Sequence, residues 1–281
     1  MQDVRDCLLA WVRRRAPEDA TRWLEGRALA YAEGAPERAL FLDFSGALRR
    51  TGKAPLGLVP DDLALADRRR PAWNPAGWTT DQAARIFLVL AWPAREAGAY
   101  VGTLDKLFQS ADLGELVALY QALPILPHAA AHVRRCAEGV RTTMTDVFKA
   151  VAHGNPYPSE QLDEAAWNQM VLKALFVEVP LHPILGLDAR ANPHLSRMLL
   201  DYAKERWAAK RAVSPELWRC VGRCADDAAL GAMERVLLEG GAGERRAVAL
   251  ALRGAGHAGA KALLSRHAVE LPPGCDWAHL G

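Results

Sequence analysis

The chain has 281 residues, with 35 lysines and arginines against 33 aspartates and glutamates, so its formal net charge at pH 7 is +2. A net charge this small argues against a dedicated nucleic-acid-binding protein. Five cysteines in a chain of this length do not indicate a disulfide framework. Residues 1–15 resemble neither a signal peptide nor a membrane anchor, and the longest apolar run, residues 86–92, is far shorter than the ~20 residues that cross a bilayer. We therefore expect a cytoplasmic protein with no integral membrane segment and no nucleic-acid partner.

The first eighty residues are predicted to contain short helices followed by a long break. Composition predicts helices over residues 8–15 and 19–33, and the sequence Gly-Ala-Pro-Glu at residues 34–37 marks the start of a third helix. Residues 51–77 are rich in Pro and Gly, which predicts a long loop and the edge of a subdomain. We therefore expect residues 1–80 to form N-terminal helices plus a loop, and residues 81–281 to form one continuous helical domain.

Two helix starts after this loop carry the spacing of a capping box. Thr79 lies three residues before Gln82, and Asp112 lies three residues before Glu115. In such a box, the two side chains accept hydrogen bonds from N–H groups that the helix leaves without partners. Each pair is followed by an apolar stretch, so a helix is predicted after each.

Residues 127–151 are predicted to form the longest helix, which Pro127 opens. Its apolar residues recur at heptad spacing and predict one core-facing stripe. The stripe consists of Val133, Ala137, Val140, Met144, Val147 and Val151. His128 and His132 are four residues apart, a spacing that can bind zinc, but the spacing places no third ligand, so we expect no metal site.

Residues 167–192, WNQMVLKALFVEVPLHPILGLDARAN, join a helix to a loop interrupted by prolines. Asp163 is placed to cap this helix, and residues 164–177 contain no Gly or Pro. Leu172 and Phe176 lie among the polar residues of the side opposite Trp167, so the helix is apolar on both sides and is predicted to be buried. The candidate ligand- or partner-binding residues of this stretch are Asn168, Gln169, Lys173, His182, Asp188, Arg190 and Asn192.

Two interpretations of these polar residues stay open. In the first, the loop is pinned in place, with Asp188 paired to Arg190 and Asn192 capping the helix that begins at Pro193. In the second, the same residues line a polar pocket. The guanidinium of Arg190 would then hold a phosphate or carboxylate group by two parallel hydrogen bonds.

The C-terminal part is predicted to contain two similar helix pairs, over residues 217–238 and 245–267. Their offset of about thirty residues suggests stacked helical hairpins of the HEAT kind. No segment shows the alternation of apolar and polar residues that marks a strand. We therefore predict an all-α fold, with helical hairpins stacked as an irregular HEAT-like α-solenoid or packed as a helical bundle.

From about residue 141 to residue 222 the chain resembles the EboA family of bacterial proteins. The resemblance rests on NQMVLKALF (Asn168–Phe176), GLDARANP (Gly186–Pro193), MLLDYAKERWAAKR (Met198–Arg211) and SPELW (Ser214–Trp218). It implies membership of the ebo gene cluster, which is associated with moving precursors of secondary metabolites out of the cytoplasm. The resemblance implies a pathway and no particular reaction, so no catalytic residues follow from it.

Two hypotheses about function follow. The first is a non-enzymatic cytoplasmic adaptor or small-metabolite-binding protein of that pathway. Its expected partners are other proteins of the ebo gene cluster and a small polar or anionic metabolite. The second is an enzyme that modifies a cyclitol, a sugar phosphate or a prenylated intermediate with Lys173, His182, Asp188 and Arg190. The chain contains no GxSxG and no paired-cysteine zinc motif, and we expect no cofactor.

Overall fold

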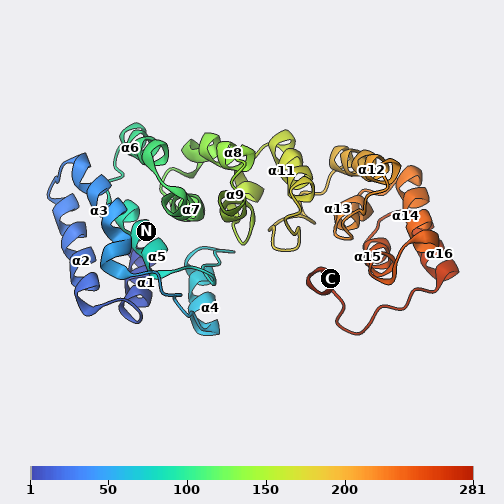
Figure 1. Ribbon diagram of the computed structural model, residues 1–281, viewed down its shortest axis with the longest axis horizontal. Helices are drawn as coiled ribbons and strands as arrows, with labels where there is room; N and C mark the ends of the chain where they lie inside the picture. Colours follow the sequence, from blue (N-terminus) through green and yellow to red (C-terminus); the bar gives the residue numbers. More distant parts are fainter. Residues whose placement is uncertain (1, 281) are drawn as a thin grey trace. The chain divides into compact units, whose positions relative to one another are not determined.

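The computed structural model describes residues 2–280 and confirms the all-α prediction (Figure 1). These residues form sixteen α-helices and three short 3-10 helices, and their only bridge pairing is an isolated one between Pro55 and Thr79. The chain divides into two compact units, the first ending at Leu162 and the second beginning at Asp163. The sequence analysis placed a boundary near residue 80 instead. The helix that follows residue 80 packs on the N-terminal helices, so both belong to the first unit.

The first unit contains ten α-helices. They are α1 (Gln2–Arg13), α2 (Glu18–Ala32), α3 (Glu37–Thr51), α4 (Pro60–Arg69), α5 (Thr80–Ala91), α6 (Ala97–Ser110), α7 (Leu113–Ala122), α8 (Val133–Arg141), α9 (Thr145–Ala152) and α10 (Tyr157–Gln161). The 3-10 helices η1 (Leu123–Ile125) and η2 (Ala129–His132) lie between α7 and α8.

Helix α5 forms the centre of the first unit. It packs against α1, α2, α3 and α7, and every one of its residues except Gln82 is buried (Figure 1). The predicted capping interaction at its start is present on one side, where the N–H of Thr79 donates to Oε1 of Gln82 at 2.9 Å. Both bonds of the second predicted box are present, between Asp112 and Glu115 at the start of α7.

The predicted loop over residues 51–77 is wrong in its middle, because it contains α4. Pro60 occupies the first turn of this helix, and the side chain of Asp62 accepts a hydrogen bond from the N–H of Val59 at 3.0 Å. Acidic residues in the first turn and basic residues in the last turn also favour this helix through its dipole. A short polar helix of this kind has few apolar residues from which to predict it.

The single long helix predicted over residues 127–151 is also wrong, since η2, α8 and α9 replace it. The helical conformation is interrupted between α8 and α9, where the N–H of Met144 donates to the hydroxyl of Thr142 at 3.2 Å. The break folds the predicted stripe back on itself, because α8 packs on α9. Gly139 permits this close packing, since a Cβ atom there would lie 2.6 Å from Cγ2 of Val151.

The second unit contains six α-helices and the 3-10 helix η3 (Trp277–His279). The α-helices are α11 (Glu164–Phe176), α12 (Pro193–Ala208), α13 (Leu217–Arg223), α14 (Asp227–Glu239), α15 (Ala242–Arg253) and α16 (Ala258–His267). The first predicted helix pair corresponds to α13 and α14, and the second to α15 and α16. Helix α15 packs on α13 and α14 of the first pair as well as on α16. A HEAT-like repeat beyond these two pairs stays a prediction.

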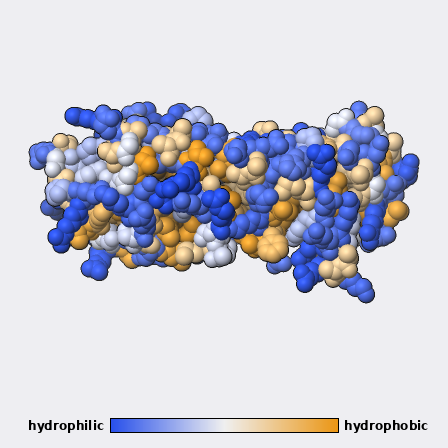
Figure 2. All heavy atoms as spheres, turned by 90° about the horizontal axis from the view of Figure 1, so that it is seen from above, coloured by the Kyte–Doolittle hydropathy of each residue, from blue (hydrophilic) through white to orange (hydrophobic). Residues whose placement is uncertain are grey.

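The prediction of a buried helix over residues 164–177 is only partly right. Trp167, Met170 and Val171 of α11 are completely buried, as expected for the core-facing side. On the other side Phe176 is 76% exposed and Gln169 is also exposed. Exposed hydrophobic residues occur in both units, and the face drawn in Figure 2 is mostly hydrophilic, with its hydrophobic residues in separate patches.

Candidate functional site

Two of the seven candidate residues, Asn168 and Asn192, are held together in the second unit. Asn168 is buried in α11, and the two side-chain amides exchange hydrogen bonds of 3.2 and 2.9 Å. Oδ1 of Asn192 also accepts a bond of 2.8 Å from the N–H of Leu195, so Asn192 caps α12 as the sequence suggested. These two amides use their hydrogen-bonding capacity to fix the loop to the helices on either side of it.

Asp188 takes different partners from the one expected. Its carboxylate accepts two parallel hydrogen bonds from Arg219, both 3.0 Å long, and lies 3.6 Å from Arg223. Hydrogen bonding to Arg219 lowers the pKa of Asp188 below its usual value. The guanidinium of Arg190 lies instead over the ring of Trp167, 5.0 Å from its centroid. The expected pair of Asp188 with Arg190 is therefore not formed, because Arg219 and Arg223 of α13 lie close enough to bind the Asp188 carboxylate.

The remaining three candidates do not gather around these groups. His182 contacts Glu216, with Nδ1 lying 3.0 Å from Oε1, and the Glu216 carboxylate also accepts the N–H groups of Leu181 and His182. Gln169 is exposed, and Lys173 is partly buried, which lowers its pKa. A binding role for the seven residues stays a prediction.

A well-formed cleft in the first unit was not predicted from the sequence. Its volume is about 470 Å³, which is within the ~300–1,000 Å³ of typical small-molecule sites. Its walls come from the ends of α3 and α5, from α7 and α9, and from the loops before α5 and after α9. The lining residues are Lys53, Trp73, Asn74, Gly77, Trp78, Asp81, Gln82, Leu113, Gly114, Val117, Gln121, Pro124, Asp146, Lys149, Ala150, His153, Gly154 and Asn155.

Two tryptophans form the aromatic part of this cleft. The rings of Trp73 and Trp78 meet edge to face at 5.9 Å, and Trp73 also packs on Trp11 at 5.5 Å. Trp11 donates its indole N–H to Asp62 at 3.0 Å. Trp73 is only 2% exposed. Its indole N–H is buried and has no hydrogen-bond partner among the described residues.

A second buried group at the cleft is also left without a partner. Within residues 2–280, Oε1 of Gln121 on α7 accepts no hydrogen bond. An unsatisfied buried polar group costs about 1–3 kcal/mol. Trp73, which carries the unpaired donor, and Gln121, which carries the unpaired acceptor, both line the cleft.

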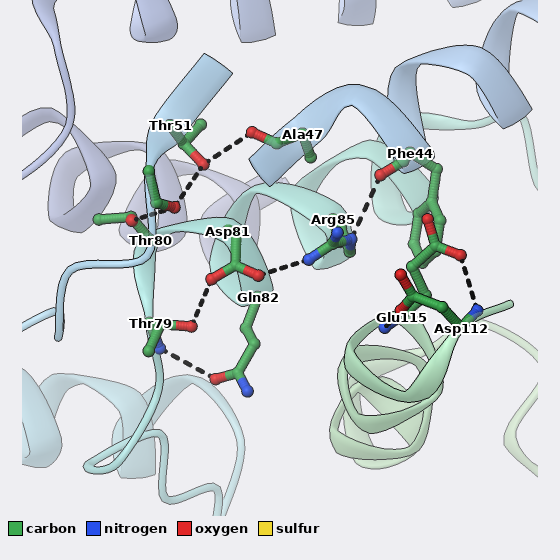
Figure 3. Close-up of polar contacts among 11 residues, drawn as sticks. Phe44, Ala47, Thr51, Thr79, Thr80, Asp81, Gln82, Arg85, Asp112 and Glu115 are labelled. Atoms are coloured by element: carbon green, nitrogen blue, oxygen red, sulfur yellow. Dashed lines mark hydrogen bonds and ion pairs between the residues drawn. The ribbon is translucent and has the colours of Figure 1, made fainter. Parts of the chain in front are cut away.

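Asp81 is fixed at the wall of the cleft by a buried ion pair (Figure 3). Its carboxylate accepts a hydrogen bond of 2.6 Å from the hydroxyl of Thr79 and pairs with Arg85, one turn along α5. Arg85 donates in turn to the carbonyl oxygen of Phe44 at 3.2 Å, and its guanidinium lies over the Phe44 ring. The side chains of the pair are only 3% and 5% exposed. Asp81 is therefore neutralised and oriented from inside the fold.

Asn155 fixes the opposite wall. Its amide donates to the carbonyl oxygens of Tyr120 and Ala150, and its Oδ1 accepts the N–H of Tyr157, which connects α7, α9 and α10. Because Arg85 neutralises Asp81, the charged lining groups that remain are Lys53, Lys149 and Asp146, with His153 beside them. The net charge of the cleft is therefore slightly positive.

The two histidines that we considered as zinc ligands are used inside the fold. Nε2 of His128 lies 2.8 Å from the carbonyl oxygen of Ala94, and Nε2 of His132 lies 2.9 Å from that of Pro127. Burial lowers the pKa of His132. Among the described residues, no three His, Cys, Asp or Glu side chains are grouped so that they could hold a metal ion. No helix in residues 2–280 is both long enough and apolar enough to cross a membrane.

The sequence analysis missed the cleft because its residues come from segments that are far apart in the chain. Trp73 lies in the Pro- and Gly-rich stretch that was interpreted as a loop, Trp78 directly follows it, and Gln121 and Lys149 lie on α7 and α9. The one available signal was the pair of tryptophans itself, since two large aromatic residues in a loop indicate that the loop packs against a core.

The comparisons with known proteins extend the resemblance noted in the sequence. The model of one family, described as metabolite traffic protein EboA, matches residues 4–222, whereas the resemblance covered about residues 141–222. The match includes every residue that lines the cleft. No curated protein and no solved structure is significantly similar to the chain. Because the family model covers well over half of the sequence, the chain belongs to the EboA family.

Proposed function

We propose that this protein is a non-enzymatic, cytoplasmic metabolite-binding protein of a bacterial pathway that moves precursors of secondary metabolites. The cleft of the first unit holds the metabolite, and other proteins of the ebo gene cluster are its partners. The description of the family as metabolite traffic proteins supports a role in handling a small molecule. The size of the cleft supports the same role, since it is large enough for one such molecule.

The lining of the cleft favours a small polar or anionic ligand. Within residues 2–280 the indole N–H of Trp73 has no hydrogen-bond acceptor and Oε1 of Gln121 has no donor, so a bound ligand can supply both. Hydroxyl groups supply both, because a hydroxyl donates one hydrogen bond and accepts others. The ammonium groups of Lys53 and Lys149 outnumber the carboxylate of Asp146, so a negative charge on the ligand is also accommodated.

The unpaired N–H of Trp73 is the observation that carries this proposal. A buried donor without a partner lowers the stability of the empty protein, by about 1–3 kcal/mol in general. Functional sites often keep such costs because binding requires them. A group that is retained for binding can therefore be removed without loss of stability, which distinguishes it from an ordinary core residue.

The experiment compares Trp73→Phe with Trp11→Phe. Wild-type and variant proteins are incubated with a metabolite extract from cells that express an ebo gene cluster, separated from free metabolites by gel filtration, and analysed by mass spectrometry. We expect wild type and Trp11→Phe to retain the same metabolite and Trp73→Phe to lose it. In thermal melting, Trp11→Phe should have a lower melting temperature than Trp73→Phe. The reason is that Trp11→Phe removes the hydrogen bond to Asp62, whereas Trp73→Phe removes an unpaired group.

Two results would contradict the proposal. Retention of the metabolite by Trp73→Phe at the wild-type level would show that the cleft is not the binding site. A large fall in the melting temperature of Trp73→Phe, greater than that of Trp11→Phe, would assign Trp73 to the core alone.

A further inference from the structure

A second, smaller cavity in the second unit is rich in arginine. Its volume is about 210 Å³, and α13, the end of α15 and the C-terminal segment form its walls. The charged lining residues are Asp188, Arg219, Arg223 and Arg253, and the indole of Trp277 lies beside them. The cavity is separate from the cleft of the first unit and shares no residue with it.

The charges in this cavity are not balanced. Among the described lining residues Asp188 is the single carboxylate, and its two oxygens are used by the parallel hydrogen bonds from Arg219. Arg223 lies 3.6 Å from the same carboxylate and is about half exposed. The guanidinium of Arg253 has no hydrogen bond or ion pair within residues 2–280. Three guanidinium groups therefore face one carboxylate, and the cavity has an excess of positive charge.

The packing of the helices brings these arginines together. Arg219 and Arg223 are four residues apart on α13 and so lie on the same face. Gly222 lies between them in the sequence and contacts α15, where a Cβ atom would lie 2.8 Å from the carbonyl oxygen of Ala251. This close approach places the last residue of α15, Arg253, beside the arginines of α13.

We propose that this cavity binds the phosphate or carboxylate group of a small metabolite, through Arg223 and Arg253, with Arg219 held in place by Asp188. A guanidinium matches the geometry of both anionic groups and donates two parallel hydrogen bonds to either. The volume is sufficient for one such group and too small for a whole cofactor. Arg219 is a positioning residue, because its Nε and one Nη2 donor are already bonded to Asp188.

Isothermal titration calorimetry with inorganic phosphate tests this site in the full-length protein, in a buffer of low ionic strength without other multivalent anions. We expect binding of one phosphate per chain at this cavity. Arg253→Gln should weaken it about tenfold, because it removes a charge-assisted contact. The matched control is Arg197→Gln, an exposed arginine on α12 of the same unit, which should bind as wild type does.

Asp188→Asn gives a change of the opposite sign. Removal of the carboxylate leaves all three guanidinium groups for the anion, so phosphate should bind more tightly than in wild type. A residue of purely structural importance would not produce opposite effects in Asp188→Asn and Arg253→Gln. Circular dichroism shows whether Asp188→Asn is folded, and if it is not, the comparison of Arg253→Gln with Arg197→Gln decides alone.

Three outcomes would overturn the proposal. The first is no heat of binding for wild type, and the second is an equal loss of affinity in Arg253→Gln and Arg197→Gln. The third is binding to vesicles that contain phosphatidic acid without binding of free phosphate, which would make the partner a membrane surface. None of these outcomes affects the cleft of the first unit, which the Trp73→Phe experiment tests separately.

Discussion

Replacement of Arg85 by methionine should strongly destabilise the first unit. The guanidinium neutralises Asp81 in a place where both side chains are almost fully buried, and it also donates to the carbonyl oxygen of Phe44. Methionine has a similar volume and no charge, so the substitution leaves the carboxylate of Asp81 uncompensated. Breaking a buried ion pair in this way costs about 3–5 kcal/mol. The lost bond to Phe44 falls within that figure, since contributions within one network do not add.

Urea unfolding followed by circular dichroism measures this effect. We expect a fall of about 3–5 kcal/mol in the free energy of unfolding for Arg85→Met. The double variant Asp81→Asn/Arg85→Met should recover part of this loss, because no uncompensated charge is left. Arg22→Met is the matched control, since Arg22 forms an exposed pair with Glu18 at 3.8 Å, and such pairs contribute little.

The reasoning about the buried pair would be refuted by one clear result. If Arg85→Met unfolds at the same urea concentration as Arg22→Met, the carboxylate of Asp81 does not depend on the guanidinium. A double variant less stable than Arg85→Met would contradict the charge explanation in another way, because neutralising Asp81 would then have removed a favourable contact.

Three further predictions concern packing, pH and thiol chemistry. Gly222→Ala should lower the melting temperature by several degrees, because its Cβ would lie 2.8 Å from the carbonyl oxygen of Ala251, and normal melting would show that α13 and α15 separate easily. Hydrogen bonding to Arg219 lowers the pKa of Asp188, so this pair stabilises the fold above about pH 4 and the stability is lost as the pH falls through the lowered pKa. The difference in melting temperature between wild type and Asp188→Asn should therefore shrink below about pH 4, and a difference independent of pH would contradict the assignment. Burial raises the pKa of the Cys136 thiol to about 12, so iodoacetamide followed by peptide mass spectrometry should modify Cys136 only after unfolding.

The sequence predicted the start of a helix correctly where the capping side chain lies within a few residues of the N–H group that it accepts. The side chain of Asp163 accepts the N–H of Ala166, Asn192 caps α12, and Asp112 and Glu115 form a complete capping box. Each of these interactions spans three residues, so the sequence contains all of it. The break at Thr142 was missed because Gly139 and its contact with Val151 are decided by packing between two helices, which periodicity alone does not contain.

The candidate sites also depend partly on residues that are close in the sequence and partly on contacts between distant segments. Asn168 and Asn192 were selected as candidate binding residues, and the structure pairs their side chains with each other. Asp188 was also selected, but its partner Arg219 lies 31 residues further along the chain. The cleft with Trp73 and Gln121 requires the packing of α5, α7 and α9 to be known, so no local pattern could have predicted it.

The most direct test of metabolite binding at the first unit observes the indole N–H groups by nitrogen-15 NMR. The protein has nine tryptophans, and spectra of the Trp73→Phe and Trp78→Phe variants assign the two indoles of the cleft. When the metabolite retained in the gel-filtration experiment is added, the account predicts that the Trp73 signal moves strongly downfield as its N–H gains an acceptor, while the signal of Trp218 in the second unit is unchanged. A Trp73 signal that stays at the same frequency while the metabolite binds would contradict the central claim.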